Sequence, residues 1–192
     1  VPAVTVNRLC GSGLEAVIEA SRAIALGDAS VCVAGGVESM SRAPWVLPKP
    51  EKGFARGHET AYSTTLGWRM VNPEMPDQWT VALGEGAEIL ADKYAISREA
   101  QDEFALRSHQ RAGAAWAAGK FADEAVPAPG VDLRRDESIR SDTTMEALAK
   151  LKPAFRPDGT VTAGNASPLN DGASAVLLAD VDGLRAVGRE PL

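Results

Sequence analysis

Cys10 is the residue best suited to do chemistry, because it lies between a strand-like segment and a segment with helical periodicity, in the sequence Asn7-Arg-Leu-Cys-Gly-Ser-Gly13. A thiol at a helix N-terminus meets unpaired backbone N–H groups and the positive end of the helix dipole, which favour the thiolate. The same N–H groups can stabilise an oxyanion when a thiolate attacks a carbonyl. A nucleophile and a small buried cysteine at a tight turn are equally good interpretations of Cys10. Cys32, within an apolar run, is expected to be an inert buried thiol.

A nucleophilic cysteine needs a base, which is usually histidine. His58 lies in an irregular segment, and His109 lies between Arg107 and Arg111 on a polar helix surface. Both histidines are therefore expected on the solvated surface, and a base for Cys10 is expected from outside this chain. The sequence has no nucleophile-elbow, phosphate-loop, dinucleotide or metal-ligand spacing, so the enzyme classes that use them lose support.

A second concentration of polar groups lies in the segment Val161-Thr-Ala-Gly-Asn-Ala-Ser-Pro-Leu-Asn-Asp-Gly172. Small residues with many hydrogen-bonding groups suit either a tight structural turn or the lining of a polar ligand site. Turn chemistry is the more common role for such residues and is the favoured interpretation.

The elements around Cys10 predict a βαβ unit. Residues 4–9 have strand character, residues 14–25 have a helical period with Gly27 as its stop, and residues 30–34 form a short apolar strand. On the helix, the predicted buried face comprises Leu14, Val17, Ile18, Ser21 and Ala25. Two strands joined by a helix predict a parallel sheet buried between helices.

The middle of the chain is an excursion from this core. Prolines and glycines interrupt residues 42–79, and helical patterns return over 81–95 and from the Ser97 N-cap to residue 118. The buried face of the 81–95 helix is predicted as Leu83, Ala87, Leu90, Ala91 and Tyr94. Thr143 and Glu146 predict a capping box for a short helix that reaches Leu151. Strands are predicted over 160–163 and 174–179, which gives an α/β core with a helical insertion.

Composition excludes several classes of protein. The 192 residues carry a net charge of −6, with 45% hydrophobic and 24% charged residues, as in an ordinary globular protein. The negative balance argues against nucleic acid or an anionic membrane surface as the main partner. No apolar run has the length of a membrane span, and the cytoplasm is the expected compartment. The sequence begins at Val1 on a strand-like segment, which predicts an internal piece of a longer protein.

Several segments together resemble the acyl-CoA thiolases, in order and spacing along essentially the whole chain. These segments are residues 6–13, 27–30, 33–41, 143–155 and 161–173. The resemblance implies an incomplete, layered α-β-α core with an inserted, mainly helical loop domain, or lid, that binds CoA. It divides the chain into an N-terminal half over 1–45, a loop domain over 46–157 and a return of the N-terminal half over 158–192.

The resemblance also implies the roles of individual residues. Cys10 matches the cysteine that takes the acyl group from an acyl-CoA as a thioester, and the implied CoA contacts are Arg140, Leu151, Ser167 and Leu83. Coenzyme A and acyl-CoA enter as substrates, with no permanently bound cofactor and no metal. Pro168 replaces the usual glycine after Ser167, and residues 82–86 are a loose version of the family segment. The family's catalytic histidine and second cysteine are absent. A homodimer or homotetramer is implied.

The predicted function is acyl transfer between CoA thioesters, by thiolysis of a 3-oxoacyl-CoA or by condensation of acetyl-CoA. The Ser41-Arg-Ala-Pro44 and Thr64–Arg69 stretches favour a degradative type, the 3-oxoadipyl-CoA type included. One alternative is a non-catalytic fragment of a thiolase that binds CoA or serves assembly. Another is a decarboxylating condensing enzyme of the wider superfamily, which the Val33–Met40 segment disfavours.

Overall fold

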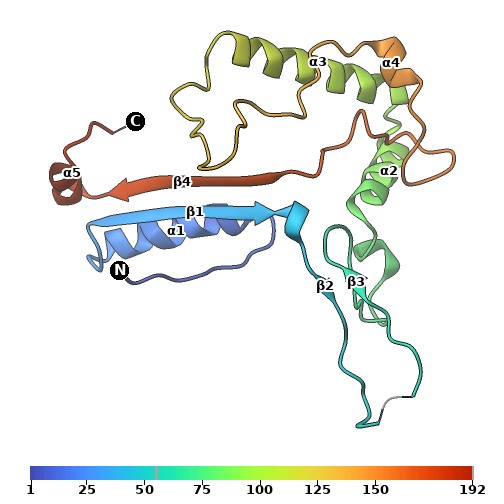
Figure 1. The fold of residues 1–192 in the computed structure, drawn as a ribbon, viewed down its shortest axis with the longest axis horizontal. Coiled ribbons are helices and arrows are strands. Elements are labelled where there is room, and N and C mark those ends of the chain that lie inside the picture. Colours follow the sequence, from blue (N-terminus) through green and yellow to red (C-terminus); the bar gives the residue numbers. More distant parts are fainter. Residues whose placement is uncertain (55, 192) are drawn as a thin grey trace. The chain divides into compact units, whose positions relative to one another are not determined.

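The computed structural model describes residues 1–54 and 56–191 and divides into two compact units (Figure 1). Unit 1 comprises Val1–Ala43 and Leu169–Leu192, and unit 2 comprises Pro44–Pro168. Residues 158–168, which were expected with the N-terminal half, pack within unit 2. Among the described residues, no helix is both long and apolar enough to cross a membrane.

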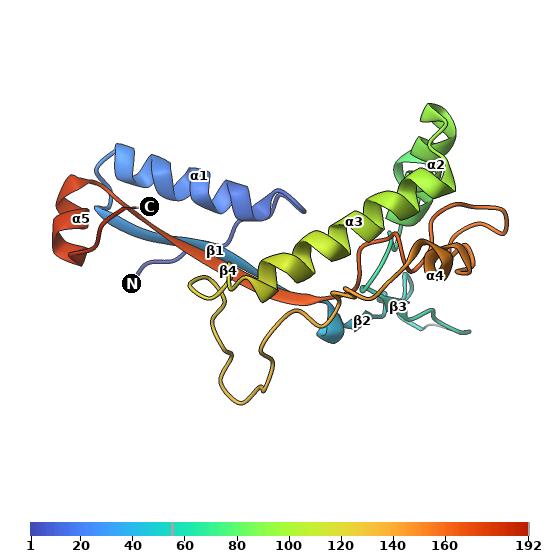
Figure 2. The same ribbon diagram turned by 90° about the horizontal axis from the view of Figure 1, so that it is seen from above.

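Unit 1 is built on a two-stranded antiparallel sheet. Strand β1 (Val31–Ser39) pairs with strand β4 (Asp171–Ala179) over its whole length, from Val31 opposite Ala179 to Ser39 opposite Asp171. Helix α1 (Ser12–Ala25) packs along β1, and helix α5 (Val181–Val187) follows β4 (Figure 2). The strand predicted over 174–179 is confirmed and begins three residues earlier, at Asp171.

The predicted parallel βαβ unit is wrong within the described residues. Residues 4–6 form no strand, and β1 takes the later strand β4 as an antiparallel partner. The backbone N–H groups of the next residues are bonded to side chains. Ser12 Oγ accepts from the Arg8 N–H and Asn7 Oδ1 accepts from the Leu9 N–H, each at 2.9 Å. Backbone donors bonded to side chains are not offered to a ladder, so this segment forms a turn.

The helix predicted after Cys10 is confirmed, and its end has a clear cause. Gly27 adopts φ 80°, which glycine tolerates better than other residues. The Gly27 N–H donates to the Ile24 carbonyl at 3.1 Å, and the Asp28 N–H donates to the Ala23 carbonyl at 2.9 Å. This pair of hydrogen bonds is a Schellman motif, which satisfies the last carbonyls of α1.

The sheet of unit 1 is apolar on both faces. Ala34 is buried and Cys32 is half-buried on one face, whereas Val33 is 73% exposed on the other, opposite Leu177. A strand that is apolar on both faces is typical of a sheet covered on both sides. Of α1, however, no residue is fully buried, and Leu14, Ser21 and Ala25 of its predicted buried face are exposed.

Unit 2 contains helices α2 (Leu83–Tyr94), α3 (Arg98–Ala117) and α4 (Met145–Ala149). Shorter elements are η1 (Met40–Arg42) in unit 1, and β2 (Trp45–Val46), β3 (Tyr62–Ser63) and η2 (Asp77–Trp79) in unit 2. The predicted helices over 81–95 and 97–118 are confirmed, and the Ser97 side chain caps α3 by accepting from the Ala100 N–H at 3.2 Å.

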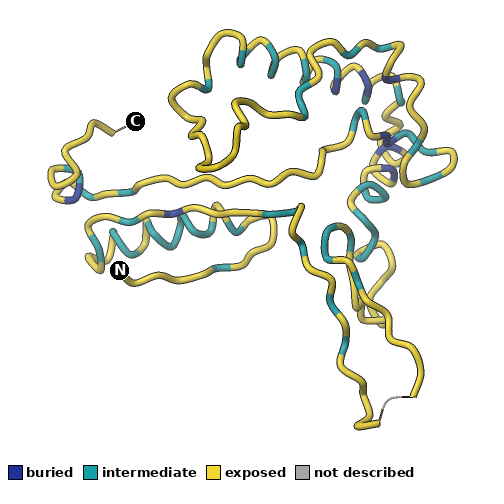
Figure 3. The backbone as a smooth tube through the Cα atoms, in the orientation of Figure 1, coloured by how far each residue is buried: buried dark blue, intermediate teal, exposed yellow. Residues whose placement is uncertain are grey.

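The buried residues of unit 2 lie on and beside these helices (Figure 3). On α2 they are Glu88 and Ala91, so the predicted apolar face is confirmed only at Ala91. Its other members are exposed, namely Leu83, Ala87, Leu90 and Tyr94. The reason is that α2 turns a carboxylate inward to bind backbone N–H groups, which leaves its leucines outward. The predicted capping box of the short helix is also wrong. Helix α4 is capped by Thr144, whose Oγ1 accepts from the Ala147 N–H at 3.2 Å, and no Thr143–Glu146 box forms.

Residues 160–163 form no strand beyond an isolated antiparallel bridge between Pro153 and Thr162. Their backbone donors are again bound by side chains: Glu88 accepts from the Thr160 and Val161 N–H groups, and Asn165 accepts from the Thr162 N–H. The segment is therefore a fixed turn instead of a strand.

Candidate functional site

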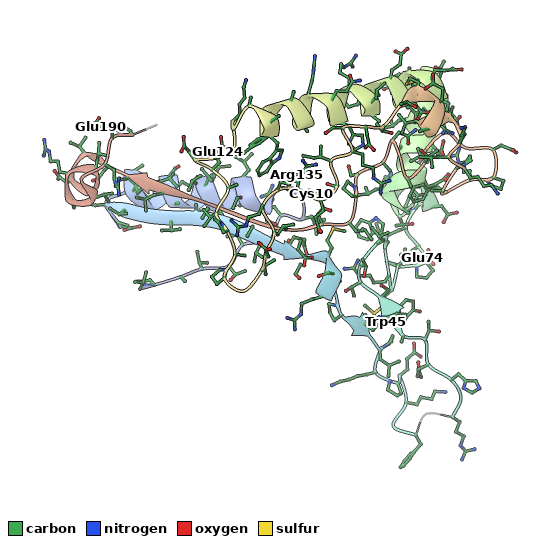
Figure 4. The ribbon with its side chains drawn as sticks, turned by 45° about the horizontal axis from the view of Figure 1, so that its top comes forward. Cys10, Trp45, Glu74, Glu124, Arg135 and Glu190 are labelled. Carbon is green, nitrogen blue, oxygen red and sulfur yellow. The ribbon has the colours of Figure 1, made fainter. Side chains whose placement is uncertain are left out.

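Cys10 lies one residue before the N-cap of α1, in a hydrogen-bonded turn (Figure 4). The Gly11 N–H donates to the Arg8 carbonyl at 3.0 Å, and the Ser12 hydroxyl donates to the Leu9 carbonyl at 2.7 Å. In addition, the side-chain oxygens of Ser12 and Asn7 accept from the N–H groups of Arg8 and Leu9. Hydrogen bonds therefore fix the backbone on both sides of Cys10. The thiol is exposed.

The residue before Cys10 carries backbone strain. Leu9 has φ 51°, a left-handed conformation that disfavours a residue with a Cβ by about 1–2 kcal/mol. Such outliers persist only where surrounding bonds hold them, and they concentrate at functional sites. Here the side chains of Asn7 and Ser12 supply those bonds, so the turn fixes the backbone on both sides of Cys10.

The start of α1 beside Cys10 is open. A Cβ at Gly13 would meet no atom within 4 Å, and the Gly13 and Leu14 N–H groups form no hydrogen bond with other described residues. Free N–H groups at a helix N-terminus suit a developing oxyanion. Unit 1 contains no histidine, since His58 and His109 both belong to unit 2.

Unit 2 holds a pocket of about 290 Å³ between α3 and the turn formed by residues 160–167, the Ser167 turn. Three segments line it: one face of α3, residues 138–139 and the turn itself. The lining residues are Phe104, Ala105, Ser108, His109, Ala112, Ser138, Ile139, Gly164, Asn165, Ala166, Ser167 and Pro168. Ser167 is exposed to this space, and Pro168 does not prevent the turn from forming.

Two buried carboxylates hold the Ser167 turn, and the sequence analysis identified neither. Glu88, on α2, is 1% exposed and accepts from the Thr160 N–H at 2.9 Å, the Val161 N–H at 2.8 Å and the Thr160 hydroxyl at 2.8 Å. Burial raises the pKa of Glu88, but these hydrogen bonds, with a smaller effect of Arg156, outweigh burial and leave its pKa below the ordinary value.

Asp102, on α3, is the second buried carboxylate and is also 1% exposed. Its Oδ1 accepts from Asn165 Nδ2 at 2.9 Å, and its Oδ2 accepts from Arg98 Nε at 2.8 Å. Each of these carboxylates lies three residues before a buried alanine on its helix, Ala105 for Asp102 and Ala91 for Glu88, and this spacing is the signal in the sequence that could have identified both.

The four residues that the resemblance implied as CoA contacts lie in unit 2, at different places. Leu151 is 38% exposed. It was predicted to lie on the short helix, but α4 ends at Ala149 and Leu151 follows it. Its Cδ1 lies 2.5 Å from the position of a Cβ on Gly164, so it packs against the Ser167 turn. Leu83 begins α2, is 85% exposed and does not line the pocket.

Arg140 is exposed and is tied to the pocket through its backbone, because its N–H donates to His109 Nδ1 at 3.2 Å. His109 is half-buried and lines the pocket, so the expectation of a freely solvated histidine is wrong. Within the described ranges, no group of three or more His, Cys, Asp or Glu side chains could hold a metal ion.

Comparisons with known proteins place the chain in a family. The family model described as "Thiolase, N-terminal domain" matches residues 1–182. A Beta-ketoadipyl-CoA thiolase from Pseudomonas putida is 50% identical over 100% of this chain and 49% of its own length. A 3-oxoadipyl-CoA/3-oxo-5,6-dehydrosuberyl-CoA thiolase from Escherichia coli is 48% identical over 100% of this chain and 49% of its own.

Solved structures give the same result. Human mitochondrial 3-ketoacyl-CoA thiolase in complex with CoA has a TM-score of 0.87 and 40% identity, over 99% of this chain and 48% of that one. The Bacillus anthracis acetyl-CoA acetyltransferase has a TM-score of 0.80 and 42% identity, over 97% of this chain and 48% of that one. These likenesses confirm the α/β thiolase fold, and the chain spans about half the length of the relatives it matches. The chain belongs to the thiolase family, and residues 1–182 match the model of the family's N-terminal domain.

Proposed function

We propose that this chain supplies the nucleophile and part of the CoA-binding surface of an acyl-CoA thiolase. The observation that carries the proposal is the turn at residues 7–12, which presents an exposed Cys10 at the start of α1. Beside it, the N–H groups of Gly13 and Leu14 have no hydrogen-bond partner in the described part of the chain. Family membership supports the same role for this cysteine.

In the proposed reaction, the Cys10 thiolate attacks the 3-oxo carbon of a 3-oxoacyl-CoA. A bond forms between Sγ and that carbon, and the N–H groups at the start of α1 stabilise the oxyanion. The bond between carbons 2 and 3 then breaks, the electron pair leaves with the acetyl-CoA portion, and a proton from an acid completes acetyl-CoA. The thiol of a second CoA attacks the Cys10 thioester, which releases the shortened acyl-CoA and restores the cysteine.

The acid and base for these proton transfers belong outside unit 1 in this proposal, because unit 1 has no histidine. A thiol nucleophile is activated by an adjacent base, and no side chain of unit 1 other than carboxylates offers one near neutral pH. The part of the relatives' length that this chain does not match is the expected source.

Coenzyme A is the proposed ligand of unit 2. The pocket beside Ser167 joins the Ser167 turn, the residues before Arg140 and the face of α3 that bears His109. Leu151 packs against the same turn, and Leu83 is an exposed apolar contact on α2. The human relative in complex with CoA supports this assignment. A 3-oxoacyl-CoA with a dicarboxylic acyl chain is the proposed substrate class, in line with the names of the relatives from Pseudomonas putida and Escherichia coli.

A homodimer or homotetramer is part of the same proposal. Val33 and Leu177 lie exposed on a sheet face that is apolar, and a face of this kind is normally covered by another layer. Light scattering on the protein produced from its complete coding sequence measures the oligomeric state directly.

The test of function is acylation of Cys10. The protein produced from its complete coding sequence is incubated with acetyl-CoA or acetoacetyl-CoA, and intact mass and peptide mapping locate any acyl group. Addition of one acetyl group at Cys10, absent in Cys10→Ala, is the expected result. An acyl group on another residue, or none under conditions in which CoA binds, refutes the nucleophile.

A second candidate function, a non-catalytic CoA-binding or assembly chain, is favoured by the absence of a histidine from unit 1. It predicts that CoA binds, as measured by calorimetry, while Cys10 stays unmodified by either thioester. The two measurements together therefore separate the two functions.

A further inference from the structure

Asp102 binds two groups that lead to different parts of unit 2. Its two carboxylate oxygens each accept one hydrogen bond, from Asn165 and from Arg98, and the side chain is almost fully buried. A buried charge with both oxygens bonded is a rigid anchor, because either bond can be broken only by exposing or unpairing the charge.

Asn165 carries the anchor to the turn that ends in Ser167. Its Oδ1 accepts from the Thr162 N–H at 2.8 Å, and its Nδ2 donates to the Thr160 carbonyl at 3.0 Å as well as to Asp102. The amide oxygen and nitrogen of Asn165 therefore both bond to the backbone of the turn, and a shift of the turn would break the hydrogen bond between Asn165 and Asp102.

Arg98 carries the anchor to the segment that contains Leu151. Its Nη2 donates to the Leu148 carbonyl at 2.7 Å and to the Leu151 carbonyl at 3.1 Å. These carbonyls lie at the C-terminal end of α4, where a cation is favourable. The charge of Arg98 is in turn balanced by Asp102 at 2.8 Å.

The two segments also contact each other directly. A Cβ on Gly164 would lie 2.5 Å from Leu151 Cδ1 and 2.6 Å from Leu148 Cδ2, so the glycine allows the turn to pack on these leucines. Nearby, the Ala154 N–H donates to the Val161 carbonyl at 2.9 Å. Asp102 is therefore connected to both of these packed segments, through Asn165 to the Ser167 turn and through Arg98 to the segment that contains Leu151.

We propose that Asp102 is a positioning residue for coenzyme A. It fixes the Ser167 turn and the segment that contains Leu151 relative to each other, so that both can contact the ligand. This inference rests on the proposed function of unit 2. Asp102 itself touches neither the reacting atoms nor, in this proposal, the ligand.

The variant Asp102→Asn tests the inference. Whichever way the new amide is oriented, its NH₂ group faces a donor, either Arg98 Nε–H or Asn165 Nδ2–H, so one of the two segments is released. A lost charge-assisted hydrogen bond of this kind corresponds to CoA binding that is weaker by about tenfold or more.

The experiment measures the Kd of CoA by calorimetry, with the protein produced from its complete coding sequence. The rate of Cys10 alkylation by iodoacetamide is measured in parallel, because it reports on unit 1 and is expected to stay unchanged. Glu85→Gln is the matched control. It breaks a bidentate ion pair with Arg156 in the same unit, at 2.6 to 2.9 Å, and touches neither the Ser167 turn nor α4.

Weaker CoA binding by Asp102→Asn, with unchanged alkylation of Cys10 and near wild-type binding by Glu85→Gln, supports the inference. Equal losses in both variants, or wild-type binding by Asp102→Asn, overturn it. If the wild-type protein binds no CoA, the proposed function of unit 2 fails, and the inference fails with it.

Two milder variants carry the test if Asp102→Asn does not fold. Asn165→Ser releases only the turn, and Arg98→Lys keeps the charge but cannot reach Asp102 and both carbonyls at once. Each is expected to weaken CoA binding several-fold. Together they are expected to be less than additive, since both act through the same carboxylate. Full additivity contradicts a shared anchor at Asp102.

Discussion

Replacing Glu88 by glutamine is expected to release the turn at Thr160 and Val161 from α2. Both carboxylate oxygens accept hydrogen bonds, so the amide NH₂ of Glu88→Gln faces a donor in either orientation. Loss of a buried hydrogen bond to a charged group destabilises by about 1.5–3 kcal/mol, and leaving a donor unsatisfied adds to this. We therefore expect a local loss of about 3 kcal/mol.

Hydrogen exchange at the Val161 amide is the assay, because this N–H is buried and donates to Glu88 at 2.8 Å. A loss of about 3 kcal/mol corresponds to a decrease in protection of roughly 100-fold, at one factor of ten per 1.4 kcal/mol. Glu103→Gln is the control, since Glu103 is exposed on α3 and its side chain makes no hydrogen bond or ion pair with other described residues. Wild-type protection in Glu88→Gln refutes the reasoning.

The same carboxylate predicts a pH dependence. The pKa of Glu88 in the folded protein lies below its ordinary value of 4.5. Its contribution to stability is therefore complete above about pH 4.5 and is lost as the pH falls through the lower folded-state pKa. Unfolding by urea is expected to become easier in this acid range for the wild type, with a smaller change for Glu88→Gln. A parallel acid profile for the two proteins contradicts this assignment.

Four further substitutions, one of them a control, test the turns and caps. Ser12→Ala removes three hydrogen bonds of the turn, and we expect slower acylation of Cys10, measured by mass spectrometry, with an unchanged Kd for CoA. Thr144→Ala removes the cap of α4 at about 1 kcal/mol, whereas Thr143→Ala is expected to leave hydrogen exchange in α4 unchanged; equal effects contradict the observed cap. Gly164→Ala places a Cβ against two leucine side chains, which is expected to lower stability by about 1–3 kcal/mol in thermal unfolding and to weaken CoA binding.

Local chemistry in the sequence was enough for the elements that depend only on near neighbours. Helix α1 and its Gly27 stop follow from periodicity and a residue that tolerates positive φ, and Ser97 caps α3 as predicted. The place of Cys10 before a helix N-terminus was likewise readable from the residues on either side of it. The family followed from several short segments in a fixed order.

The tertiary structure alone decided where the buried carboxylates bond. Glu88 and Asp102 lie inside unit 2 because donors that are 72 and 63 residues away in the sequence meet them there. Because of those long-range bonds, α2 buries the side of the helix that carries Glu88, and residues 160–163 form a turn instead of the predicted strand. The same bonds hold the Ser167 turn near Leu151. The predicted parallel sheet failed for a local reason instead, because the side chains of Ser12 and Asn7 bind the Arg8 and Leu9 N–H groups and make that segment a turn. Periodicity reports which side chains are apolar, whereas burial depends on which distant backbone groups need a partner.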